Sequence, residues 1–118
     1  MSTPAERCVV VVPTYQEAAN ILALLDAVAV AAPYADVLVV DDGSPDGTAG
    51  LVAARARHDP RVHLLERTSK DGLGAAYRAG FAWALTQGYE RIAQMDADLS
   101  HPPERLDALF RALDSADV

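Results

Sequence analysis

The sequence predicts an α/β domain in which helices cover both faces of a parallel sheet. Four short apolar runs, at residues 8–12, 37–40, 62–65 and 92–95, alternate with four longer segments of helical periodicity. Neighbouring parallel strands must be joined by crossover connections, and helices of this length supply them. The chain has 118 residues, of which 51% are hydrophobic, and this suits a single folded domain.

The first half of the chain predicts two strand–helix units. Residues 8–12 are rich in valine and end at Pro13, which indicates a strand buried on both faces and stopped by the proline. A helix is predicted at 17–32, because apolar side chains recur there at i, i+3, i+4 and i+7. These side chains are Ile21, Leu24, Leu25 and Val28. The strand at 37–40 leads through a turn-rich segment into an alanine-rich helix at 48–58.

The second half repeats this pattern. A strand at 62–65 precedes a helix at 74–87 that ends before Gly88, and a strand at 92–95 precedes a helix at 103–113. The expected buried stripes are Tyr77, Phe81 and Leu85 on the first of these helices, and Leu106, Leu109, Phe110 and Leu113 on the second. Because the alternation calls for a further strand, we expect residues 1–118 to be the N-terminal part of a single domain, truncated at its C-terminal end.

Composition and charge exclude several classes of function. The formal net charge is −7, and an acidic surface argues against nucleic acid as the partner. Cys8 is the only cysteine, which excludes an intramolecular disulfide and a cysteine-based zinc site. No run of about 18–20 apolar residues is present, so no transmembrane segment is expected in this chain.

The residues that follow the first two strands are candidates for a nucleotide site. Ligands of parallel α/β sheets bind beyond the carboxyl ends of the strands. Tyr15 and Glu17 follow the first strand, where Glu17 can accept hydrogen bonds from a base or a ribose; a helix start with an acid near its positive end is the alternative. After the second strand, turn chemistry does not explain the adjacent acids Asp41 and Asp42, which favours a functional role for Asp42.

The segment after the fourth strand predicts a metal site. Asp96 and Asp98 are two residues apart, so in an extended segment both side chains project to the same side. Two carboxylates suit Mg²⁺ or Mn²⁺, which bind through one or two acids together with substrate phosphates. The alternative is a solvated acidic turn in which Ser100 caps the last helix.

A glycine-containing loop precedes the third helix. Glycines at a helix entry let backbone N–H groups approach an anion, which makes Lys70 and Gly74 candidates for binding an anionic group of a ligand. The dinucleotide pattern G-x-G-x-x-G fails because Tyr77 stands at its last position. A plain helix start explains the same residues.

Four motifs together resemble the polyprenyl-phosphate (dolichyl-phosphate) mannose synthases, which are inverting glycosyltransferases of the GT-A fold. They are residues 13–17 (PTYQE), 41–48 (DDGSPDGT), 70–76 (KDGLGAA) and 95–103 (MDADLSHPP), in this order along the chain. The resemblance implies the nucleotide-binding, Rossmann-like half of a GT-A domain. It also implies which residues contact the donor: Pro13, Tyr15 and Glu17 the nucleoside, Val40 and Asp42 the base, and Asp96, Ala97 and Asp98 the diphosphate and metal. Gln16 stands where the family usually has asparagine, and Ser100 where some relatives have a glutamine that ligates the metal.

The reaction implied by this resemblance is transfer of mannose from GDP-mannose to a polyprenyl phosphate, assisted by Mg²⁺ or Mn²⁺. The partners would be the nucleotide sugar and a lipid acceptor at a membrane surface, with the protein peripheral to the cytoplasmic face. In relatives, the basic residues that hold the acceptor lie beyond position 118. Two alternatives stay open, a related enzyme with a UDP-sugar donor and a non-catalytic nucleotide-binding module. A phospho-receiver domain is disfavoured, because Pro13 follows the first strand and Glu66 and Arg67 the third.

Overall fold

The computed structural model describes residues 7–68, 72–98 and 102–115, with side chains described up to residue 111. Its sheet contains four parallel strands in the order β3-β2-β1-β4. The strands are β1 (Cys8–Thr14), β2 (Asp36–Asp41), β3 (Val62–Glu66) and β4 (Arg91–Gln94). The helices are α1 (Ile21–Ala31), α2 (Thr48–Ala56), α3 (Leu73–Thr86) and α4 (Leu106–Ser115), and a 3₁₀ turn at Pro103–Arg105 precedes α4.

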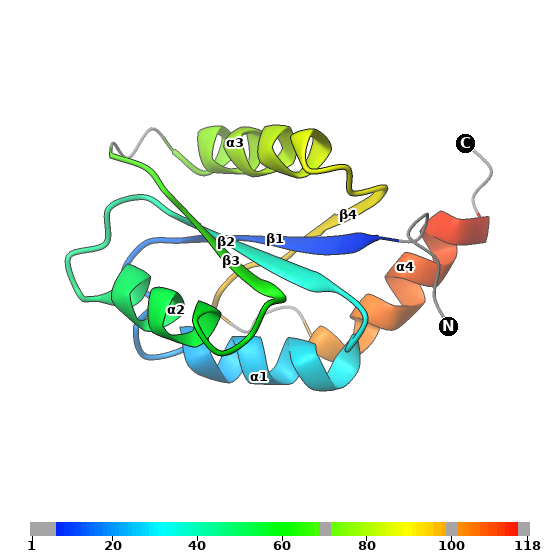
Figure 1. Cartoon of the computed structure of the whole chain (residues 1–118), viewed down its shortest axis with the longest axis horizontal. Coiled ribbons are helices and arrows are strands. Elements are labelled where there is room, and N and C mark those ends of the chain that lie inside the picture. Colours follow the sequence, from blue (N-terminus) through cyan, green and yellow to red (C-terminus); the bar gives the residue numbers. More distant parts are fainter. Residues whose placement is uncertain (1–6, 69–71, 99–101, 116–118) are drawn as a thin grey trace.

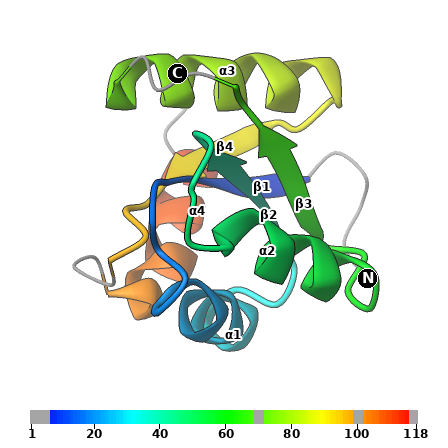
Figure 2. The ribbon, with the colours of Figure 1, turned by 90° about the vertical axis from the view of Figure 1, so that its left-hand side faces the viewer.

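Helices cover the two faces of the sheet unequally. Figure 1 shows α3 alone above the sheet and α1, α2 and α4 below it, and the view in Figure 2 agrees. Alternate residues of β1 therefore enter different cores: Val9 and Val11 pack with α3, and Val10 and Val12 pack with α1. Every residue of β1 is buried, which confirms the predicted strand buried on both faces.

The expectation that Pro13 stops the first strand is wrong, because β1 continues to Thr14 and Pro13 pairs with Val40. The carbonyl of Val11 accepts a hydrogen bond from the backbone N–H of Met95, so the nitrogen of Pro13, two residues on, faces the same side. The ladder between β1 and β4 ends at the pair Val11 and Gln94. Pro13 therefore lies beyond the end of the β1–β4 ladder, where no backbone N–H is needed for a hydrogen bond to β4.

Two expected helical stripes need correction. On α3 the buried residues are the small Ala76, Gly80 and Ala84, and Leu85 is 67% exposed. On α4 Leu106 and Phe110 are buried as expected, but Leu109 is 43% exposed, and Leu113 lies outside the described side chains. The predicted stripe of α1 is confirmed, although residues 17–20 form a turn before the helix begins at Ile21. No helix in the described ranges combines the length and apolarity needed to cross a membrane.

Gly80 sets the distance between α3 and the sheet, and its replacement by alanine is expected to destabilise the protein. A Cβ atom at this position would lie 2.5 Å from Cγ1 of Val11 and 3.1 Å from Cγ2 of Val40, both fully buried. We expect Gly80→Ala to lower the free energy of unfolding by about 1–3 kcal/mol, measured by urea denaturation.

Gly50 on α2 provides the matched control. No atom lies within 4 Å of the position that its Cβ would take, so Gly50→Ala changes helix propensity without a clash. This variant is expected to gain up to about 1 kcal/mol. Equal stability changes in the two variants would contradict the close packing of α3 on β1 and β2.

Candidate nucleotide and metal site

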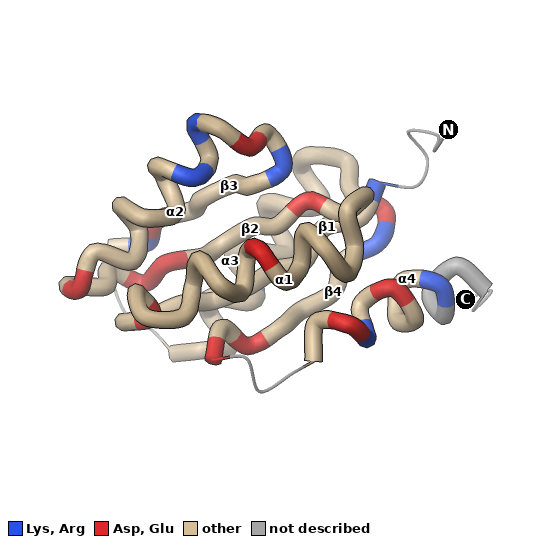
Figure 3. Tube along the Cα trace, turned by 90° about the horizontal axis from the view of Figure 1, so that it is seen from below, with Lys and Arg blue, Asp and Glu red and all other residues tan. Residues whose placement is uncertain are grey.

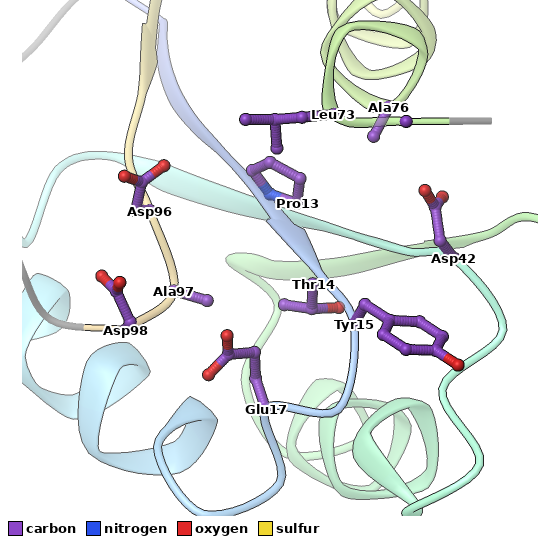
Figure 4. A pocket seen from close by; sticks show the side chains of 11 residues that line it. Pro13, Thr14, Tyr15, Glu17, Asp42, Leu73, Ala76, Asp96, Ala97 and Asp98 are labelled. Carbon is purple, nitrogen blue, oxygen red and sulfur yellow. The ribbon is translucent and has the colours of Figure 1, made fainter. Parts of the chain in front are cut away.

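A pocket of about 330 Å³ opens beyond the carboxyl ends of β1, β2 and β4. Figure 4 shows Asp96 and Asp98 on one side, Asp42 and Tyr15 on the other, and Pro13 and Thr14 between them. Above them lies the first turn of α3. The lining residues are Pro13, Thr14, Tyr15, Glu17, Asp42, Gly72, Leu73, Ala76, Asp96, Ala97 and Asp98.

Asp41 holds the loop after β2 against the end of β1. Its carboxylate is 1% exposed and accepts hydrogen bonds from Oγ1 of Thr14 at 2.7 Å, from Oγ of Ser44 at 2.6 Å and from the backbone N–H of Ser44 at 2.9 Å. These three donors compensate the burial of a charge directly after a buried strand. The first acid of the adjacent pair therefore has a structural role.

The loop after β1 is tied to the same segment through its backbone. The N–H groups of Gln16, Glu17 and Ala18 donate to Oγ of Ser44, Oγ1 of Thr48 and Oδ2 of Asp46, at 2.7, 3.0 and 3.1 Å. The hydrogen bond from the Thr48 hydroxyl lowers the pKa of Asp46 below its usual value, so this acceptor is ionised at neutral pH. The two motifs thus form one scaffold that presents Tyr15 and Glu17 to the pocket.

Gln16 adopts a backbone conformation that few residue types favour. Its φ is +57°, in the left-handed region. Asparagine adopts this conformation more readily than glutamine. This preference is a physical reason for the asparagine that usually stands here in the family that the sequence resembles.

Asp42 is paired with a residue that the sequence analysis did not assign to the site. Oδ1 of Asp42 lies 3.2 Å from Nη1 of Arg67, and Asp42 is only 8% exposed. The register of the sheet explains this contact. Asp41 and Glu66, the last residues of β2 and β3, pair with each other, so the residues that follow them, Asp42 and Arg67, lie side by side. The sequence contains a signal for this pair: Arg67 directly follows β3, just as Asp42 directly follows the neighbouring strand β2.

Asp96 and Asp98 lie on the segment that leaves β4, with the buried Ala97 between them. Asp98 is exposed, and Asp96 accepts a hydrogen bond at 3.2 Å from the hydroxyl of Tyr77 on α3. Burial, followed by the charge of Asp96, raises the pKa of Tyr77 to about 12, so this hydroxyl remains a donor at neutral pH.

The donor set fits a hard divalent cation. The described residues contain no group of three or more histidine, cysteine, aspartate or glutamate side chains with a geometry suited to a metal. Two carboxylates beside an open pocket instead match the way Mg²⁺ and Mn²⁺ bind, with the remaining positions taken by water and substrate phosphates. Ser100 lies outside the described residues.

The pocket is acidic. Four carboxylates line it, those of Glu17, Asp42, Asp96 and Asp98, and within the described part of the chain no lysine or arginine does. In Figure 3 acidic segments gather at the left-hand end, where the strands end. Most basic segments lie around the α2–β3 connection and at the opposite end. The negative charge of these side chains favours an anionic ligand that arrives together with a cation.

Comparison with known families identifies the family of the chain. The family model of glycosyl transferase family 2 matches residues 9–118. The chain belongs to this family.

Curated relatives of this chain include two bacterial proteins named as a mannosyltransferase and a monophosphomannose synthase. The chain is 50% identical over 112 residues to the undecaprenyl-phosphate mannosyltransferase of Micrococcus luteus, covering 95% of this chain and 46% of the relative. It is 51% identical over 113 residues to the polyprenol monophosphomannose synthase of Mycolicibacterium smegmatis, covering 95% of this chain and 43% of the relative. The chain thus spans less than half the length of these relatives.

A solved structure confirms the predicted GT-A architecture. The mannosyltransferase PcManGT from Pyrobaculum calidifontis, solved in complex with GDP-Man and Mn²⁺, superposes with a TM-score of 0.73 and 31% sequence identity. The match covers 95% of this chain and 32% of that one. The predicted resemblance to the polyprenyl-phosphate mannose synthases is likewise confirmed at the level of the family and its named members.

The pocket brings together seven of the residues predicted from the sequence. They are Pro13, Tyr15, Glu17, Asp42, Asp96, Ala97 and Asp98. Val40 is buried beneath α3 and Gly74 is exposed, and neither lines the pocket; Lys70 lies outside the described residues. Sequence reasoning did not assign Thr14, Gly72, Leu73 or Ala76 to the site, although all four occur within the motifs that carried the resemblance.

Proposed function

We propose that this chain binds GDP-mannose together with Mg²⁺ or Mn²⁺, as the donor site for inverting transfer of mannose to a polyprenyl phosphate. The names of the two mannosyltransferases that are about half identical to it support this function. So does the GDP-Man and Mn²⁺ complex of the structural neighbour. The single observation that carries the proposal is a pocket at the strand ends lined by four carboxylates.

The carboxylates of Asp96 and Asp98 would hold the cation. When bound, this cation supplies charge stabilisation to the departing diphosphate. Asp98 is exposed and Asp96 partly buried, so both are accessible from the open side of the pocket. Ala97 carries no bulk between them, which leaves room for phosphate oxygens.

The nucleoside would lie on the other side of the pocket. Asp42, held by Arg67, accepts hydrogen bonds from N–H groups of the base. Glu17 accepts from hydroxyl or N–H donors, and Tyr15, which is 36% exposed at the rim, offers a ring face for stacking. Pro13 and Thr14 lie between this side and the metal ligands, so the nucleoside and diphosphate would span them.

The acceptor in the proposed reaction is a lipid phosphate, which is already an anion. It therefore attacks the sugar without a strong general base. A position at the cytoplasmic face of a membrane is part of the same proposal, since a polyprenyl chain is confined to the bilayer.

Calorimetric titration of the chain with GDP and with UDP, in Mn²⁺ and in EDTA, tests the donor assignment. We expect GDP to bind at least about tenfold tighter in Mn²⁺ than in EDTA, a difference of roughly 1.4 kcal/mol. GDP is also expected to bind tighter than UDP. Preference for UDP would assign a different sugar nucleotide, and equal GDP affinity in EDTA would contradict a metal-assisted site.

A further inference from the structure

We infer that Tyr77 is a positioning residue for Asp96, whose carboxylate it holds in the orientation that binds the divalent cation. This inference rests on the proposed function, because it concerns the same metal site. The hydroxyl of Tyr77 donates to Oδ1 of Asp96 at 3.2 Å across 19 residues of sequence. The contact joins α3 to the segment after β4.

The ring of Tyr77 is fixed on the helix. Tyr77 lies on the second turn of α3, is half-buried, and packs near Phe81 with 6.2 Å between ring centroids. Asp96, by contrast, lies two residues beyond the end of β4 at Gln94 and outside regular secondary structure. A hydrogen bond from a fixed donor restricts the side-chain rotation of Asp96 and so reduces the entropy lost when a ligand binds it.

Tyr77 acts through Asp96 and not on the ligand directly. Asp96 lines the pocket, whereas Tyr77 is absent from its lining. Loss of a residue that hydrogen-bonds to a metal ligand, without touching the metal itself, typically weakens metal binding by about 10- to 100-fold.

The chemistry of the partner distinguishes two of the carboxylates that line the pocket, those of Asp42 and Asp96. Asp42 is paired with the guanidinium of Arg67, whose positive charge offsets that of the carboxylate and repels a second cation. Asp96 receives a hydrogen bond from the hydroxyl of Tyr77, a neutral donor that does not itself offset the charge of the carboxylate.

Tyr77→Phe tests this role, because it removes the hydroxyl and keeps the ring. Mn²⁺ binding in the presence of saturating GDP is measured from the electron paramagnetic resonance signal of free Mn²⁺, and GDP binding in EDTA by calorimetry. We expect the Mn²⁺ dissociation constant to rise about tenfold, while GDP affinity in EDTA stays within about twofold of the unaltered chain.

Tyr34→Phe is the matched control, since Tyr34 also donates to an aspartate, Asp107, but does not line the pocket. It should leave both affinities unchanged. In an Asp96→Asn background, Tyr77→Phe should have no further effect on Mn²⁺ binding, which a general loss of folding would not reproduce.

Unchanged Mn²⁺ affinity in Tyr77→Phe would overturn the inference while leaving the proposed function intact. An equal loss of GDP affinity in EDTA would also overturn it, because the tyrosine would then shape the whole pocket. If the unaltered chain binds GDP without regard to Mn²⁺, the proposed metal-assisted function fails and the inference fails with it.

Discussion

Asp98→Ala is expected to abolish the gain in GDP affinity that Mn²⁺ provides. Asp98 is an exposed carboxylate on the rim of the pocket, two residues from Asp96, so its loss leaves one acid to hold the cation. If the cation binds as proposed, loss of one of its two carboxylate ligands removes the electrostatic basis for bringing a diphosphate into an acidic pocket. Calorimetric titration of GDP in Mn²⁺ and in EDTA should give nearly the same dissociation constant for this variant.

Asp26→Ala is the control for this experiment. Asp26 lies on α1 and forms an exposed ion pair with Arg55 at 2.9 Å, outside the pocket. Exposed pairs of this kind contribute at most about 1 kcal/mol to stability, so the control remains folded and should keep the full Mn²⁺ effect. Retention of the Mn²⁺ effect in Asp98→Ala would show that the cation binds elsewhere.

Asp42→Ala and Glu17→Ala are each expected to weaken GDP binding by about ten- to a hundredfold. A buried hydrogen bond to a charged group is worth on the order of 1.5–3 kcal/mol, which corresponds to this range. Both side chains line the pocket beyond the strand ends, so the loss should come from contacts with the nucleoside. GDP titrations in Mn²⁺ measure the effect.

Two companion variants separate recognition from folding. Because Asp42 is buried and paired with Arg67, its replacement by alanine also costs stability, whereas Asp42→Asn retains an acceptor for Arg67. Asp107→Ala removes another aspartate–arginine pair, with Arg111 at 2.8 Å, outside the pocket, and should bind GDP normally. If Asp42→Asn and Glu17→Ala bind GDP like the unaltered chain, these acids are structural.

The sequence predicted the fold class because the signals for it are local. Alternating apolar runs and helical periodicity identified the strands and α-helices of the described residues to within a few residues. The error at Pro13 arose because a proline ends a strand only where its missing N–H is needed, and the shorter neighbour β4 removes that need. The error at Leu85 arose because α3 approaches the sheet closely enough that Ala76, Gly80 and Ala84 face it.

The acids of the site were also predictable from the sequence alone. Residues that directly follow parallel strands meet at one edge of the sheet, whatever the order of those strands. This argument is sufficient for Glu17, Asp42, Asp96 and Asp98, and the pocket contains all four.

The partners of these acids depended on the tertiary structure. Arg67 reaches Asp42 across 25 residues and Tyr77 reaches Asp96 across 19. These contacts require β3 beside β2 and the first turns of α3 above the end of β4. The alternation of strands and helices is compatible with several orders of the strands across the sheet. The order β3-β2-β1-β4 is decided by the tertiary structure. Side-chain charge and type are properties of the sequence, but which of these side chains pair with one another depends on the neighbours that folding brings together.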